Sequence, residues 1–391
     1  MKHFSAQYVF TCTGPPLSRP LITATDDGTI VSVTDTGGKL PEISSLAYYN
    51  GIITPGFVNC HCHLELSHFA GKVEPGTGLP GFIQSIRRLR EVNEGNAEEM
   101  AVGHDAEMAS AGIVACADIC NGTDSFRAKE TSSIFYVSLI EVFGINPEKA
   151  GKRFGEALAV ARQAMSRSLE HNITPHSAYA LSLPLMSMVK QYGSGYPLSA
   201  IHFMESADET ELLERRGGTL LEYYREFGID AGTVNLPGSH ADAVINHVTT
   251  RGNLILVHNT HADENTIDRV NARGNTCWCL CPRSNNFISG AVPPVPLLRK
   301  KNCTIVIGTD SLASVSSLSI LSELIELQRS YPGTTFQEMI AWASVNGARA
   351  LGIDSWAGTI EPGKRPGLLL ISDTDLANLK LTDKSKVRRL I

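Results

Sequence analysis

The sequence predicts an α/β fold, a (β/α)8 TIM barrel with a small β-sandwich formed by the N- and C-terminal segments. Eight short apolar runs recur between residues 52 and 309, and stretches with helical spacing separate several of them. Strand-like segments also stand near both ends of the chain. With 391 residues and 42% hydrophobic content, the chain suits one large barrel or two domains of common size.

Short strands and turns are expected in the first fifty residues. An Asp-Asp-Gly turn precedes the β-branched run 29–33. Near the other end, residues 358–363 (GTIEPG) and 368–371 (LLLI) are expected to be strand-like. Because neither group can form a core alone, we expect residues 1–54 and 351–391 to pair as one small domain.

The eight apolar runs are the predicted strands of a central domain, residues 55–350. They cover 52–60, 112–119, 134–143, 172–176, 198–204, 253–258, 275–281 and 303–309. Helical spacing is found at 97–111, 152–171, 263–273 and 315–330. Eight strands alternating with helices over about 290 residues match the count and size of a (β/α)8 barrel. A doubly wound open sheet is the alternative, but histidines follow the first strand where its Gly-rich turn would stand.

Composition argues against several classes of protein. Asp and Glu number 40 against 34 Lys and Arg, and no segment collects basic residues into a stripe, so we expect no nucleic-acid partner. No apolar run is long enough for a membrane span, and no signal-type segment follows Met1. The nine dispersed cysteines predict reduced thiols in a cytoplasmic protein. We expect a small-molecule substrate and no membrane partner, and a homodimer is left open.

Histidines and one aspartate stand at the ends of predicted strands. His61 and His63 lie two residues apart at the end of the first strand, so the strand period sends both rings to one face. His202 and His258 lie at the ends of the fifth and sixth strands, and Asp310 follows the eighth. In a barrel, the carboxyl ends of the strands meet at one rim. Imidazoles with a carboxylate are zinc-type ligands, so their joint occurrence predicts a metal site.

The same stretches resemble ordered motifs of the amidohydrolase superfamily, in its deaminase and chlorohydrolase branch. Residues 55–64 (PGFVNCHCHL) are similar to the first-strand motif of that branch. Further stretches match in order at 176–179 (HSAY), 202–205 (HFME), 257–261 (VHNTH), 281–285 (CPRSN), 308–311 (GTDS) and 358–364 (GTIEPGK). The resemblance covers nearly the whole chain. It implies a hydrolase acting on C–N bonds other than peptide bonds, similar to S-adenosylhomocysteine, guanine and aminodeoxyfutalosine deaminases.

The resemblance also implies roles for individual residues. The metal ligands that it implies are His61, His63, His202 and Asp310. Its catalytic residues are Glu205 as proton shuttle, His258 as the group that orients the attacking water, and Asp310. Binuclear members carry a lysine on the fourth strand, where this chain has His176 and no lysine. One divalent ion is therefore expected, zinc with iron as the alternative.

The chemistry of deamination suits these residues independently. Water is a poor nucleophile, and a metal ion lowers the pKa of a bound water from about 15.7 to about 7. Glu205, three residues past His202, can accept the water proton and protonate a ring nitrogen. We therefore favour a hydrolytic deaminase of an aminated heterocycle. The alternatives are a chlorohydrolase or cyclic-amide hydrolase on the same scaffold, and a non-catalytic binding barrel.

Four residues near the predicted rim are candidate substrate contacts. Glu65 lies in the run His-x-His-Leu-Glu-Leu-Ser, which is similar to one in aminodeoxyfutalosine deaminases, and it can accept hydrogen bonds from sugar hydroxyls. A loop-capping acid is the competing interpretation of Glu65. The other candidates are His176, Arg283 and Asn285.

The loop after the first predicted strand contains arginines that could indicate the kind of substrate. Arg87, Arg88 and Arg90 are candidates to meet a substrate carboxylate, although a helix from about residue 81 cannot aim all three inward. We predict a 6-aminopurine nucleoside with an extended 5′ substituent, such as aminodeoxyfutalosine or a 5′-substituted adenosine, over free cytosine or guanine.

Overall fold

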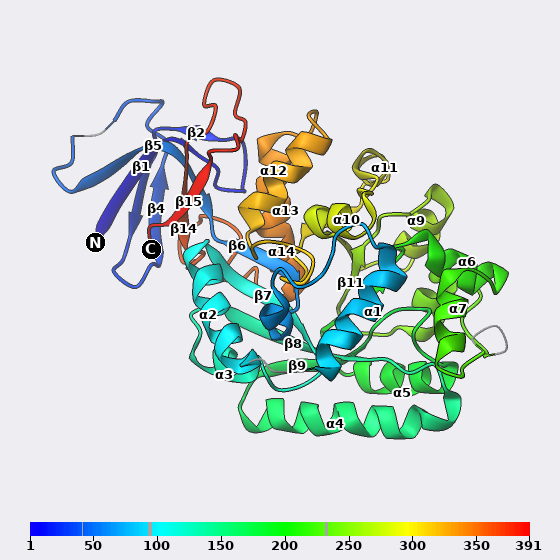
Figure 1. The fold of residues 1–391 in the computed structure, drawn as a ribbon. Coiled ribbons are helices and arrows are strands. Elements are labelled where there is room, and N and C mark those ends of the chain that lie inside the picture. The colour runs from blue at the N-terminus through cyan, green and yellow to red at the C-terminus, as the bar shows by residue number, and fades with distance from the viewer. Residues whose placement is uncertain (41, 93–95, 231–233) are drawn as a thin grey trace.

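The computed structural model describes residues 1–391 except 41, 93–95 and 231–233. Parallel strands alternate with helices through its central part (Figure 1). One four-stranded sheet consists of β6 (Phe57–Cys62), β7 (Ile113–Cys120), β8 (Phe135–Val142) and β9 (Glu170–Pro175). The other consists of β10 (Leu198–Phe203), β11 (Asn253–His258), β12 (Thr276–Leu280) and β13 (Thr304–Ile307). A strand therefore stands in each of the eight predicted runs.

The two parallel sheets meet at both of their edges, just past the carboxyl ends of the strands. Isolated parallel bridges join Cys62 to Asp310 and Ser177 to His202. The first junction, here called the seam, is reinforced by Asn59, whose Nδ2 donates to Thr309 Oγ1 at 2.8 Å. These contacts bring the carboxyl ends of β6, β10 and β13 to one place.

Helices cover the outside of the strands. They are α1 (Gly78–Glu91), α2 (Ala97–Ser110), α3 (Phe126–Thr131), α4 (Ala150–Ser166), α5 (Leu183–Gly193), α6 (Ala207–Arg215), α7 (Thr219–Glu226), α8 (His240–Asp242), α9 (Glu264–Asn271), α10 (Pro282–Ser289), α11 (Val295–Lys300), α12 (Ile320–Ser330), α13 (Phe336–Ala343) and α14 (Val345–Leu351). Helix α6 begins in a capping box between Ser206 and Glu209. Helix α14 ends at Gly352, whose left-handed backbone suits a helix C-terminus. None of the helices among the described residues is both long and apolar enough to cross a bilayer.

The two ends of the chain share one mixed sheet of seven strands (Figure 1). Its strands are β1 (Lys2–Val9), β2 (Leu17–Ser18), β3 (Leu21–Ala24), β4 (Ile30–Thr34), β5 (Leu46–Pro55), β14 (Leu368–Ser372) and β15 (Lys386–Arg389). Antiparallel pairing of β14 with β5 joins the C-terminal segment to the N-terminal one. Strands from the two ends of the chain thus pair, while the separate small domain of the β-sandwich type stays a prediction.

Two expectations about secondary structure were wrong. The single strand expected at 52–60 is divided at Gly56, where the backbone lies so close to Val114 that a Cβ would be 2.3 Å from one of its methyl groups. The chain consequently leaves the terminal sheet with β5 and enters the central one with β6. Residues 358–363 form no strand, since Gly358 and Gly363 adopt positive φ angles of 84° and 86°.

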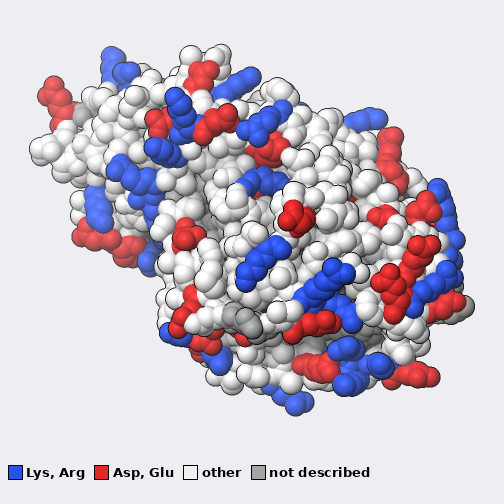
Figure 2. All heavy atoms as spheres, viewed as in Figure 1, with Lys and Arg blue, Asp and Glu red and all other residues white. Residues whose placement is uncertain are grey.

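Charged side chains of both signs are distributed over the surface. Figure 2 shows Lys and Arg interspersed with Asp and Glu over the visible face of the molecule. Many form ion pairs of opposite sign, such as Arg127 with Glu98 and Lys301 with Asp268. Exposed pairs of this kind each contribute little to stability.

Candidate metal centre and active site

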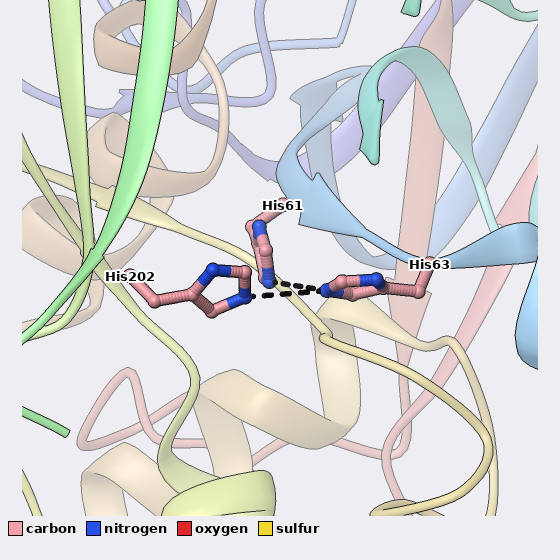
Figure 3. Close-up of side chains that lie close together, drawn as sticks. All are labelled: His61, His63 and His202. Atoms are coloured by element: carbon pink, nitrogen blue, oxygen red, sulfur yellow. Dashed lines mark hydrogen bonds between the residues drawn. The ribbon is translucent and has the colours of Figure 1, made fainter. Parts of the chain in front are cut away.

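Three buried imidazoles converge at the carboxyl ends of β6 and β10. The Nε2 atom of His63 lies 3.2 Å from that of His61 and 3.3 Å from that of His202. Figure 3 shows the three rings pointing their Nε2 atoms toward one another. Their ring nitrogens lie close enough together for a single ion to bind all three.

Asp310 completes this cluster from the end of β13. Its Oδ1 lies 3.6 Å from the Nε2 atoms of both His61 and His63. Its Oδ2 accepts hydrogen bonds from Ser284 Oγ at 2.5 Å and Ser314 Oγ at 2.7 Å. The two serines therefore fix the carboxylate with one oxygen directed at the imidazoles.

The proton positions in the cluster suit a bound cation. His202 Nδ1 lies 3.0 Å from the carbonyl oxygen of His176, so that nitrogen carries the proton and Nε2 presents a lone pair. Burial, followed by the neighbouring His61, lowers the pKa of both His63 and His202. Where all three rings carry their proton on Nδ1, their Nε2 lone pairs face one another at these distances, which is repulsive unless a cation lies between them. Three such nitrogens and a carboxylate are a donor set that fits a zinc-type ion.

Glu205 and His258 lie beside the cluster. Glu205 follows β10, and its Oε1 lies 3.6 Å from His258 Nε2. Burial, reinforced by the charges of Glu209 and Asp310, raises the pKa of Glu205 well above its usual value. A carboxyl group with a raised pKa can exchange protons near neutral pH, as general acid–base catalysis requires.

Asn285 orients the ring of His258. Its Nδ2 lies 3.1 Å from His258 Nδ1 and donates to it, which leaves the ring proton on Nε2, facing Glu205. Burial lowers the pKa of His258 well below its usual value. The ring is therefore a neutral donor directed into the site.

Strained backbone marks the same strand ends. Met204, His258, Asn259 and Asp310 adopt positive φ angles of 51°, 76°, 60° and 61°. Such conformations cost about 1–3 kcal/mol each in residues other than glycine, and they concentrate at functional sites. At these residues the chain bends away from the ends of β10, β11 and β13, next to the side chains of the cluster.

Glu65 is fully engaged in hydrogen bonds within the protein. Its Oε2 accepts from the backbone N–H groups of Asn121 and Gly122 at 2.8 and 3.1 Å, and its Oε1 accepts from Arg90 at 3.3 Å. Burial raises the pKa of Glu65 to about 7, against the opposing effect of Arg90. The carboxylate thus ties the segment after His63 to the end of β7.

Of the three arginines of α1, Arg90 contacts residues next to the site, whereas Arg87 makes its contacts elsewhere. All three are exposed. Arg90 binds Glu65 and the Oδ1 of Asn121, whereas Arg87 pairs with Glu91. Arg87 also lies over the ring of Phe227, 3.6 Å from its centroid.

Arg283 lines a cavity of about 510 Å³ next to Asp310. Its Nη1 donates to the carbonyl oxygen of Ser317 at 2.9 Å, and its Nη2 donates to Ser316 Oγ at 2.7 Å. The cavity has apolar walls from Val73, Pro75, Phe287, Leu312 and Val315, and Ser314 connects it to Asp310. It offers room for an apolar group, and Ser314 lies between it and Asp310.

His176 and Glu141 flank the cluster on its other side. The rings of His176 and His202 are stacked with centroids 4.6 Å apart. Glu141, on β8, is buried, accepts a hydrogen bond from Asn121 Nδ2 at 3.0 Å and lies 3.8 Å from His202 Nδ1. Sequence reasoning missed Glu141, although a single carboxylate within the apolar run 134–143 is a signal that could have found it.

Comparisons with known proteins identify relatives of the chain. A family model described as the Amidohydrolase family matches residues 52–389. An aminodeoxyfutalosine deaminase of a Nitratiruptor species is 28% identical over 348 residues, which cover 85% of this chain and 82% of the relative.

Two solved structures share the fold. The aminofutalosine deaminase of Helicobacter pylori in complex with methylthio-coformycin aligns with a TM-score of 0.79 at 22% identity, over 98% of this chain and 94% of the other. An adenosine deaminase from Xanthomonas campestris with bound zinc aligns with a TM-score of 0.67 at 20% identity, over 96% and 85%.

Proposed function

The chain belongs to the amidohydrolase family, and on that premise we propose that it is a metal-dependent hydrolytic deaminase of 6-aminopurine nucleosides. The observation that carries this proposal is the convergence of three imidazole nitrogens and Asp310 Oδ1 beside Glu205 and His258. The buried Nδ1 atoms of His61 and His63 have no hydrogen-bond partner among the residues that the structure describes, and such groups destabilise a fold, so the cluster is better explained by a function than by stability.

The proposed architecture follows from the contacts at the strand ends. The bridges at both edges of the parallel sheets support a closed eight-stranded TIM barrel over residues 55–350. Residues 1–54 and 351–391 then form a separate small domain of the β-sandwich type, supported by their shared sheet.

One divalent ion would be held by His61, His63, His202 and Asp310. Zinc is the proposed ion, with iron as the alternative, because three imidazoles and a carboxylate suit both. When bound, such an ion supplies an attacking water of lowered pKa.

The side chains around the cluster account for the proton transfers. Water adds to C6 of the purine to form a C–O bond, and Glu205 takes the proton of that water and delivers it to ring N1. Glu205 then takes the remaining proton from the new hydroxyl group on C6 and gives it to the amino group. The C–N bond breaks with its electron pair leaving on ammonia, and the C–O bond becomes the C6 carbonyl. His258 holds the water in line through its Nε2–H, and Asn285 maintains that orientation.

The substrate contacts are proposed from their positions. His176 stands beside His202 at the mouth of the cluster, where the purine would lie. The apolar cavity beside Arg283 would take the 5′ substituent, as in an aminodeoxyfutalosine or a 5′-substituted adenosine. Both carboxylate oxygens of Glu65 already accept hydrogen bonds within the protein. Glu65 would therefore affect sugar binding indirectly, by shaping the loop that covers the sugar.

Ammonia release tests this proposal directly. The purified, metal-loaded protein is offered adenosine, 5′-deoxyadenosine, methylthioadenosine, aminodeoxyfutalosine, guanine and cytosine, with the Glu205→Gln variant as control. We expect release from the 5′-substituted nucleosides that the variant does not show. Turnover of a free base alone contradicts the nucleoside substrate, and no release from any compound by metal-loaded protein contradicts the deaminase.

A further inference from the structure

An ion pair is buried in the core between β7 and α3, close to the cluster. Lys129 Nζ lies 2.7 Å from Asp118 Oδ2, and both side chains are 0% exposed. Lys129 also donates to Ser138 Oγ on β8 at 2.9 Å. Burial acts to lower the pKa of Lys129, but the charge and hydrogen bond of Asp118, together with smaller effects of Cys120 and Cys116, outweigh it and leave that pKa raised.

Asp118 connects this pair to the segment that carries His63. Its Oδ1 accepts the backbone N–H of Leu64 at 2.7 Å. Leu64 directly follows His63 and begins a 3-10 helix, η1 (Leu64–Phe69). On the other side of His63, Cys62 forms the backbone bridge to Asp310. His63 therefore lies between two anchored residues.

The orientation of the Asp118 carboxylate is fixed from several directions. Lys129 and Ser125 both contact its Oδ2, at 2.7 and 3.3 Å, which leaves its Oδ1 directed at Leu64. A buried ion pair is poor evidence of net stabilisation, because desolvation of both charges opposes their attraction. Its effect here is geometric, since it holds one acceptor against one backbone N–H.

We propose that Lys129 and Asp118 are positioning residues for the metal centre. They hold the chain just after His63 in place, so that the Nε2 atom of His63 lies beside those of His61 and His202. The inference rests on the proposed function in one respect, the role of His63 as a ligand. Neither residue touches the cluster itself. Their effect is therefore expected on metal affinity, in the range found for residues that orient ligands, about 10- to 100-fold.

The test measures zinc affinity without any substrate. Metal-free wild-type protein and the Lys129→Met and Asp118→Asn variants are titrated with zinc against a chromophoric chelator, and the unfolding of the metal-free proteins is followed by urea. Tyr136→Phe is the matched control, because Tyr136 is buried beside Lys129 and loses a comparable hydrogen bond, to Asp105 at 2.7 Å. We expect zinc affinity to fall at least tenfold in both variants, and to change less than threefold in Tyr136→Phe.

Each outcome is decisive. Loss of stability in Lys129→Met with zinc affinity within threefold of wild type overturns the inference, because a purely structural pair behaves in that way. If Lys129→Met does not fold, Asp118→Asn decides under the same criterion, because its single amide oxygen cannot face both Lys129 and the N–H of Leu64. Failure of the wild-type protein itself to bind zinc contradicts the proposed metal centre instead, so the two failures are distinguishable.

Discussion

His202 donates its Nδ1–H to the backbone carbonyl oxygen of His176 across 3.0 Å. The acceptor is main chain, so the orientation of this imidazole depends on the contact between the ends of β9 and β10 rather than on another side chain. Because the Nδ1 proton is held there, Nε2 is free to bind a cation. The contact between two strand ends thus determines the tautomer of a proposed ligand.

The first prediction concerns metal content. Purified protein is expected to hold about one divalent ion per chain, because a single set of three imidazoles and one carboxylate converges. His63→Ala should reduce the bound ion severalfold. Elemental analysis of both proteins by mass spectrometry checks this, and two tightly held ions per wild-type chain would contradict it.

The second prediction concerns Glu205→Gln. Metal content should be unchanged because Glu205 is not a proposed ligand, whereas kcat should fall by about 10²-fold or more as proton transfer is lost. Steady-state ammonia release and metal analysis of the same preparation check this. Activity within tenfold of wild type would show that Glu205 is not the shuttle.

The third prediction concerns Asn285→Ala. Without the donor at 3.1 Å, the His258 ring is free to place its proton on Nδ1, away from Glu205. We expect kcat to fall about 10- to 100-fold with unchanged metal content, a loss typical of residues that orient a functional imidazole. Equal losses in metal content and kcat would instead indicate a general disturbance of the cluster.

The fourth prediction is a pH dependence of stability that arises from Glu209. Burial raises its pKa to about 8, while its Oε1 accepts the N–H of Ser206 in the capping box. The folded state therefore binds a proton that the unfolded state releases between about pH 4.5 and 8. Stability from this group is fully present below that window and is lost as pH rises through it, at about 1.4 kcal/mol per pH unit at most.

Glu209→Gln removes this titration and keeps the cap, because glutamine also accepts in a capping box. Relative to wild type, the variant should become progressively more stable between pH 5 and pH 8. Urea unfolding of both proteins at several pH values measures the difference in free energy. Parallel curves would show that Glu209 does not titrate in this window.

Much of the fold could be predicted from hydrophobic patterning. The strand expected at 253–258 is present as Asn253–His258, and the helix expected at 97–111 is present as Ala97–Ser110. The division at Gly56 could not be predicted, because it depends on the close approach of Val114, which is distant in the sequence.

For the site, the histidines could be found because strand ends and side-chain type coincide. The supporting residues could not be found in that way. Lys129 lies on a short helix, and Asp118 lies within an apolar strand, so neither belongs to a recognisable motif. Their connection to His63 appears only when the strands are placed beside one another.

The hydrogen bond between Asn59 and Thr309, which reinforces the seam, can form only late in the synthesis of the chain. The two residues are 250 positions apart, so a ribosome completes the first pair of histidines long before the partner strand emerges. Contacts at such separation form late, since the chain between them must first be ordered. At that stage of synthesis the nascent chain contains His61 and His63 but not yet Asp310. The proposed centre can therefore be complete only after β13 has been made, and a prematurely terminated product that lacks β13 would have no complete set of ligands.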